Sequence, residues 1–186
     1  MVDPNGFPAV PFVDQWTEID IDNLSSSNTG VFTNTPAGSH DHVVNADGSQ
    51  LAFLGSEAGN ALEQDLIVMY KAGCNYRLTV SVGVSSRFPP SSVEPVDALE
   101  LVLFYREGND VVDIASQKVE AVGLSSTQLT DFSLYLPTIQ SSNAWIGKAI
   151  GVALRAAGMP GGFWDLDKVR LAESLPEPSL DSMLTE

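Results

Sequence analysis

The stretch ALELVLFYREGNDVVDIASQKVEAV, residues 98–122, contains two runs of strand-forming residues separated by a turn. In the first run every second residue from Leu99 to Tyr105 is apolar, so these side chains share one face of a β-strand. Gly, Asn and Asp at positions 108–110 are typical of a tight turn, and residues 111–122 then form the returning strand. The stretch therefore predicts an antiparallel β-hairpin.

Similar runs occur along most of the chain, whereas helical periodicity is nearly absent. A run of prolines and serines at residues 85–97 cannot continue a central strand and is expected to form a loop. Residues 22–48 have little regular patterning and are expected to form a long polar connection. The other predicted strands are 49–55, 61–69, 76–84, 129–139, 149–158 and 164–171. Short strands at this spacing predict an all-β fold, a jelly-roll β-sandwich of two antiparallel sheets.

The composition limits the possible partners and the organisation of the chain. Nine Lys and Arg residues stand against 24 Asp and Glu in 186 residues, a net charge of −15, which disfavours nucleic acid and anionic membranes as partners. No apolar run approaches the roughly 18 residues of a membrane helix, and the first residues lack a signal peptide, so no membrane insertion is expected. A lone Cys74 excludes an intrachain disulfide and is expected to be buried. We expect one domain over residues 1–173 and a disordered tail over 174–186.

Five motifs occur in a familiar order: DGSQLAFLG (47–55), LEQDL (62–66), KAGCNYRLTVSVGVSSR (71–87), LELVLFY (99–105) and WDLDKVRL (164–171). This order resembles the galactose-binding-like jelly-roll domains of secreted bacterial proteins. These domains include carbohydrate-binding modules and the extracellular domains of exosortase-sorted (PEP-CTERM) proteins. LPEPS (175–179) resembles the start of their sorting tag, although the apolar helix and basic end of that tag do not follow. The resemblance implies a secreted or cell-surface protein that binds a polysaccharide or glycan without catalysis.

The last predicted strand has two carboxylates that are expected to be buried. Strict alternation places Asp165 and Asp167 on the same face as Val169 and Leu171, the face expected to point into the core. An unpaired charge is very costly in such a place, so a partner is required. One alternative is that Asp167 accepts backbone N–H bonds, and another is that it pairs with an arginine.

The resemblance implies that Asp167 binds a structural calcium ion, because its position matches an aspartate that binds calcium in many of these modules. Calcium takes roughly six to eight oxygen ligands, many of them from carboxylates. Asp165 is a second candidate ligand. Further ligands are expected from the N-terminal part of the chain, where Asp14, Glu18 and Asp47 are the candidates.

Sugar binding would need exposed aromatic side chains next to polar ones. Trp145, Trp164 and Phe88 are candidates for an aromatic platform, whereas Trp16 is assigned to packing. A second candidate surface is the polar face of the strands, with Glu100, Tyr135 and Arg155.

Patterns typical of enzymes are absent from the sequence. It has no Gly-x-Ser-x-Gly motif, no pair of acids that stands out as glycosidase carboxylates, and no third histidine to join His40 and His42. We therefore expect a non-catalytic carbohydrate-binding domain. A structural or adhesive surface protein, or an accessory domain of a polysaccharide-degrading enzyme, is the alternative.

Overall fold

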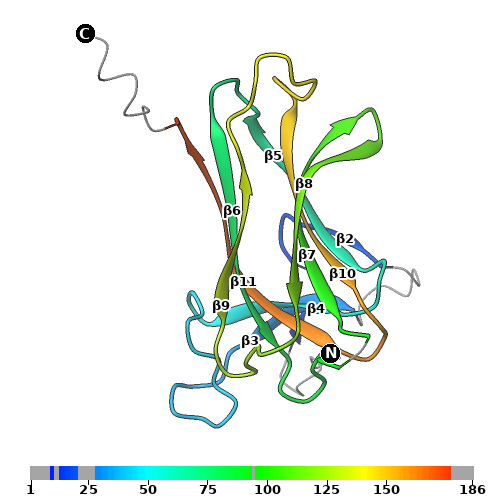
Figure 1. Ribbon diagram of the computed structural model, residues 1–186. Coiled ribbons are helices and arrows are strands. Elements are labelled where there is room, and N and C mark those ends of the chain that lie inside the picture. Colours follow the sequence, from blue (N-terminus) through cyan, green and yellow to red (C-terminus); the bar gives the residue numbers. More distant parts are fainter. Residues whose placement is uncertain (1–8, 11–12, 21–27, 94, 177–186) are drawn as a thin grey trace.

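The computed structural model describes residues 9–10, 13–20, 28–93 and 95–176, which form a sandwich of two antiparallel sheets (Figure 1). The predicted all-β jelly-roll class is confirmed. One sheet has six strands in the order β1-β3-β4-β11-β6-β9, and the other has five in the order β2-β5-β10-β7-β8. No helix in the described ranges is long and apolar enough to cross a membrane. The strands are β1 (Ala9–Val10), β2 (Thr17–Ile19), β3 (Thr29–Thr33), β4 (Gln50–Gly55), β5 (Ala61–Met69), β6 (Asn75–Val84), β7 (Ala98–Glu107), β8 (Asp110–Glu120), β9 (Thr130–Leu136), β10 (Ala149–Ala157) and β11 (Phe163–Ser174).

The core lies between the sheets and is built from the alternation seen in the sequence. Leu78 on β6 and Leu101 on β7 are fully buried, and the other apolar residues at every second position of these strands join the same cluster. The predicted hairpin is formed by β7 and β8, which pair from Ala98 with Glu120 to Glu107 with Asp110. Cys74 packs into this core with 6% of its surface exposed, as expected.

A second, smaller cluster lies on the outer face of the six-stranded sheet. Phe32 on β3 packs there with Leu51 and Phe53 of β4, beneath Val43 and Leu129 from two connecting segments. The prediction that residues 22–48 form only a polar connection was therefore wrong for residues 29–33. This strand is short, and its few apolar residues did not stand out among polar neighbours.

A β-bulge in β11 answers the question of the two carboxylates. Asp167 pairs with Ser81 of β6, but Arg170 pairs with Thr79, so two residues of β11 lie opposite one of β6. Lys168 at the bulge has a φ of 50°. The extra residue moves all later side chains to the other face. Val169 and Leu171 therefore pack on the core, and the prediction that Asp165 and Asp167 share their face was wrong.

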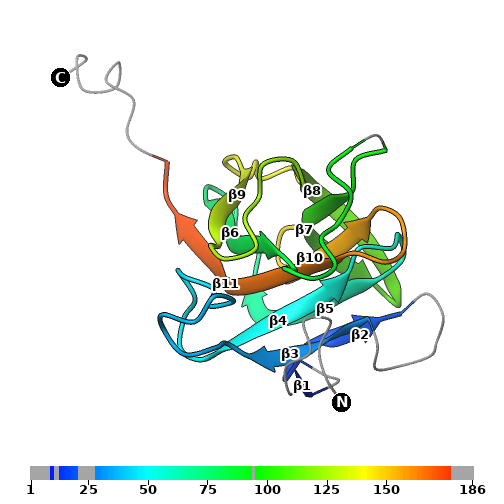
Figure 2. The same cartoon turned by 90° about the horizontal axis from the view of Figure 1, so that it is seen from below.

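Figure 2 shows the two layers from below, with β11 crossing the sandwich between β4 and β6. The predicted domain ends at residue 173, whereas β11 continues to Ser174. The division into one domain and a disordered tail stays a prediction. Residues 177–186, which include most of the predicted tail and part of LPEPS, lie outside the described residues.

Candidate functional site

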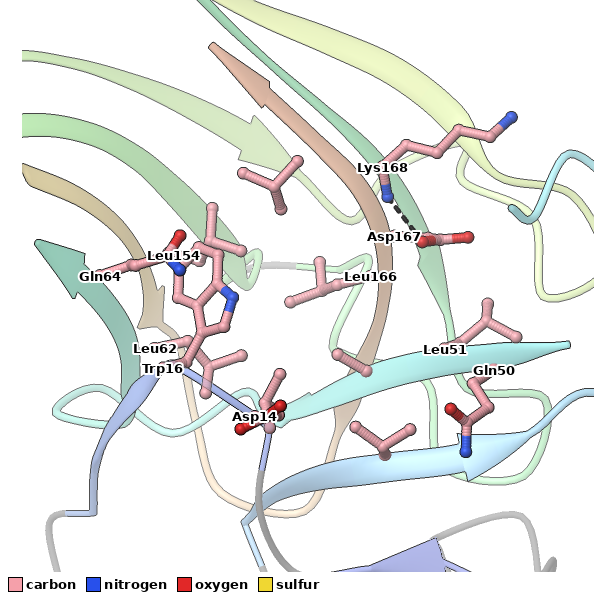
Figure 3. Close-up of a pocket in the computed structure, with 14 residues that line it drawn as sticks. Asp14, Trp16, Gln50, Leu51, Leu62, Gln64, Leu154, Leu166, Asp167 and Lys168 are labelled. Carbon is pink, nitrogen blue, oxygen red and sulfur yellow. Dashed lines mark hydrogen bonds between the residues drawn. The ribbon is translucent and has the colours of Figure 1, made fainter. Parts of the chain in front are cut away.

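A cavity of about 450 Å³ opens between the two sheets (Figure 3). It lies where neighbouring strands separate in both layers. β4 pairs with β11 only as far as Leu166, and β2 pairs with β5 only over residues 61–63. Beyond these points the inner faces lose a neighbouring strand, which leaves space between the sheets.

Two cross-strand pairs of apolar side chains form opposite walls of the cavity. Leu62 of β5 pairs with Leu154 of β10 on one sheet, and Leu166 of β11 pairs with Ala52 of β4 on the other. All three leucines are at most 1% exposed. These walls can exclude water from a ligand and offer it an apolar surface.

The segment before β2 forms part of the cavity mouth. Val13, Asp14 and Trp16 all line the cavity, and the Trp16 amide donates a hydrogen bond of 3.1 Å to the Val13 carbonyl, which closes a turn. The Val13 amide donates to the Glu18 carboxylate at 3.0 Å, so Glu18 stabilises the turn. Trp16 is half-buried and packs against the core, as predicted, but it also presents its indole to the cavity (Figure 3).

Polar side chains at the cavity come from three different elements. Gln64 on β5 is half-buried. Gln50 on β4 and Asp14 before β2 are exposed to solvent. The structure gives none of these three side chains a hydrogen bond to another described residue. They are therefore free to bind groups of a ligand.

Asp167 also borders the cavity, but its carboxylate lies on the opposite side of β11 from Leu166 (Figure 3). Its Oδ2 accepts a hydrogen bond from the Asp47 amide at 2.6 Å, and its Oδ1 accepts one from the Lys168 amide at 2.7 Å. This arrangement is the alternative in which the carboxylate accepts backbone N–H groups.

The described residues contain no group of three or more His, Cys, Asp or Glu side chains that could hold a metal ion. Asp165 is 2% exposed on β11, opposite Gly83, and Asp14 lies at the cavity mouth. Calcium binding by Asp167, Asp165, Asp14 and Asp47 stays a prediction, without a visible carboxylate cluster in these ranges to support it.

The aromatic residues predicted as a sugar platform are not brought together. Trp164 is fully buried in the core, and Trp145 is half-buried against it. Phe88 is exposed on the loop between β6 and β7, and Tyr135 is exposed on β9, where its hydroxyl accepts a hydrogen bond from Asn75. A polar loop around Trp145 and two glycines shortly before Trp164 suggested exposure, but both side chains pack on the core between the sheets.

Arg155 and Glu100 do lie together, on the outer face of the five-stranded sheet, where they line a pocket of about 220 Å³. Arg155 binds Asp113 through both guanidinium ends, at 2.6 and 3.0 Å, and approaches Glu63 at 3.6 Å. Glu63 also pairs with Arg106 at 3.0 Å. Burial lowers the pKa of Arg155, but these carboxylates outweigh burial and raise it above its usual value. The ion pairs occupy the donors that sugar hydroxyls would need.

Sequence reasoning missed the cavity, although one signal was present. In the strand at residues 61–69, Leu62, Gln64 and Leu66 share one face, so an amide interrupts an apolar series. A polar side chain on a core-facing strand position is a reason to look for a cavity.

Solved structures with a similar fold include enzymes and binding domains. The Stig cyclase Fisc from Fischerella sp. TAU, in complex with (3Z)-3-(1-methyl-2-pyrrolidinylidene)-3H-indole, is 20% identical, with 91% of this chain and 90% of that chain covered and a TM-score of 0.68. A cyclase from the same source, with the same identity, coverage and score, holds 4-(1H-indol-3-yl)butan-2-one. The CBM22-1 xylan-binding domain of Paenibacillus barcinonensis Xyn10C is 14% identical, with 90% and 91% covered and a TM-score of 0.51.

At these identities the structures show a shared fold and nothing more specific. The coarse resemblance to jelly-roll carbohydrate-binding modules is thereby supported, whereas nothing among the comparisons supports a link to exosortase-sorted proteins. No curated protein sequence matches the chain. The predicted secreted or cell-surface location is not addressed by these comparisons and stays a prediction.

A family model gives a more specific result, because the model of the HpiC1-like family, described as HpiC1 cyclase, matches residues 3–172. The prediction of a non-catalytic carbohydrate-binding domain was therefore wrong, and so was the prediction of a polysaccharide partner. The jelly-roll motifs that suggested both belong to the fold, which proteins of either activity share. With a match over most of its length, this chain belongs to the HpiC1-like family of cyclases.

Proposed function

We propose that this protein is an enzyme that cyclises a small, mostly apolar substrate bound between its two sheets. The observation that carries this proposal is the cavity of about 450 Å³ with leucine walls in a member of a cyclase family. Its volume lies within the range of roughly 300–1,000 Å³ that is usual for small-molecule sites.

The substrate class is inferred from the walls and from the related structures. Two Fischerella cyclases hold compounds built on an indole ring. The Leu62–Leu154 pair, the Leu166–Ala52 pair and the Trp16 indole give the cavity apolar surfaces of the kind that a bicyclic aromatic ring contacts. An indole-bearing substrate is therefore the class that we propose here.

Cyclisation joins two parts of one molecule, so the enzyme must first fold the substrate. Apolar walls that hold the ring and its chain in contact reduce the entropic cost of ring closure. Where positive charge develops during closure, the aromatic face of Trp16 and the carboxylate of Asp14 can stabilise it. A substrate that closes without gain or loss of atoms gives a product of unchanged mass.

A binding experiment tests the location of the site. 4-(1H-Indol-3-yl)butan-2-one is titrated by calorimetry into the wild type, into Ala52→Phe, and into Ala149→Phe. Ala52 lines the cavity, whereas Ala149 is exposed at the start of β10, away from the cavity lining. We expect binding by the wild type and by Ala149→Phe, and a loss of at least about tenfold in affinity for Ala52→Phe because the new ring fills the cavity.

Catalysis is tested on indoles that carry an unsaturated side chain, with chromatography and mass spectrometry to detect products of unchanged mass and altered retention. Product from the wild type and Ala149→Phe, but not from Ala52→Phe, supports the proposal. Binding and turnover that are the same in all three proteins would refute the inter-sheet site. Circular dichroism of each variant shows whether the fold is intact.

A further inference from the structure

Gln64 is placed where a strand of the core would normally present an apolar side chain. It lies on the inner face of β5 between Leu62 and Leu66, and it pairs across the sheet with Val152 of β10. Leu62, Leu66 and Val152 all belong to or pack on the main core. The amide is half-buried and lines the cavity on the side of Leu154 and Trp16 (Figure 3).

The Gln64 amide has no hydrogen-bond partner among the described residues, which is also true of Gln50 and Asp14, but Gln64 alone of these three is half-buried. An apolar residue would extend the core packing at this strand position, so the amide is not explained by packing. Gln50, in contrast, is exposed and can bind solvent water. Water in the open cavity can bind the Gln64 amide, and a ligand that displaces this water keeps its affinity only if it replaces the hydrogen bond.

A carboxamide has a property that matters for an indole substrate, because it both donates and accepts hydrogen bonds. The ring nitrogen of a 1H-indole is a donor, whereas that of a 3H-indole is an acceptor. The two compounds held by the Fischerella cyclases differ in this respect. Rotation of the amide about its last side-chain bond lets one glutamine bind either form.

We propose that Gln64 determines specificity by hydrogen-bonding the ring nitrogen of an indole substrate in the cavity. This proposal rests on the proposed function. It assigns a place to the aromatic ring, with its faces towards the two apolar walls and its nitrogen towards the end of the Gln64 side chain.

The test compares ligands with and without the ring N–H. Dissociation constants of 4-(1H-indol-3-yl)butan-2-one and its N-methyl derivative are measured by calorimetry for the wild type, Gln64→Leu and Gln64→Glu. The matched control is Gln117→Leu, because Gln117 is exposed on β8 and does not line the cavity. We expect the wild type and Gln117→Leu to bind the N–H ligand about tenfold more tightly than the N-methyl ligand.

Gln64→Leu should bind the two ligands about equally, while Gln64→Glu should keep the preference because its carboxylate still accepts the N–H. An unchanged tenfold preference in Gln64→Leu would overturn the role of Gln64 and leave the cavity site intact. A wild type that binds both ligands equally would also overturn it. If the wild type binds neither ligand, the proposed function fails together with this inference.

Discussion

Shortening a leucine at the cavity should cost less stability than shortening one in the closed part of the same core. Leu166 and Leu78 both lie on the inner face of the six-stranded sheet, and they are 1% and 0% exposed. Only Leu166 lines the cavity. The pair Leu166→Ala and Leu78→Ala therefore compares the same chemical change at an open and at a closed site.

The loss in free energy of unfolding for each variant is the sum of two contributions. Removal of three carbon atoms from a buried side chain costs about 2.5 kcal/mol at either site, at about 0.8 kcal/mol per carbon. A closed void adds about 24 cal/mol per Å³, which brings typical Leu→Ala costs up to about 5 kcal/mol. At Leu166 the new space joins an existing solvent-accessible cavity, so most of this second contribution is absent. We expect about 2.5–3 kcal/mol for Leu166→Ala and about 4–5 kcal/mol for Leu78→Ala.

Urea unfolding followed by tryptophan fluorescence measures both free energies of unfolding, and an unchanged slope with urea shows that the unfolding transition is comparable. Equal costs for the two variants, or a higher cost for Leu166→Ala, would refute the reasoning. Such a result would mean that the space beside Leu166 is closed in solution, and a site for a substrate would be lost with it.

Three further predictions concern the stability of the β-sandwich that surrounds the cavity. Gly151→Ala should lower the free energy of unfolding by about 1–3 kcal/mol in urea, because its Cβ would lie 2.2 Å from the Phe104 ring; an unchanged midpoint would contradict this packing. Hydrogen bonds from Ser81 and Arg170 lower the pKa of Asp131 below its usual 3.8. This depressed pKa stabilises the folded state above pH 3.8 and ceases to do so as the pH falls through the folded-state value. Asp131→Asn should therefore lower the melting temperature slightly at neutral pH and not in strong acid, and an equal effect at both would argue against this ionisation. If calcium is bound, a chelator should lower the melting temperature of the wild type and leave that of Asp167→Asn unchanged; no shift in the wild type would remove the calcium site.

Most strands could be predicted from the sequence because alternation at every second residue reflects burial directly. The strand at residues 76–84 and the first strand of the hairpin, at 98–107, are examples in which strong apolar series coincide with buried faces. The bulge at Lys168 could not be predicted in this way, since alternation assumes one residue per partner. A single extra residue reversed the faces of all that follow and made Asp167 look core-facing.

The candidate site was harder to predict because it depends on where strand ladders end. Leu62, Leu154 and Leu166 look like ordinary core residues in the sequence, and only the early ends of the β2–β5 and β4–β11 ladders open a cavity beside them. Trp16 was correctly assigned to packing, and its second role at the cavity depends on the turn that precedes it. Function was not predictable from fold motifs, because cyclases and xylan-binding domains share this sandwich.

The most direct test of this account is a crystal structure of the protein in complex with 4-(1H-indol-3-yl)butan-2-one. We predict electron density for the indole ring between the Leu62–Leu154 pair and Leu166, with its nitrogen within hydrogen-bonding distance of Gln64. Density on the outer face of the five-stranded sheet beside Arg155, with an empty cavity at saturating ligand, would contradict the central claim that this protein binds its substrate between its two sheets.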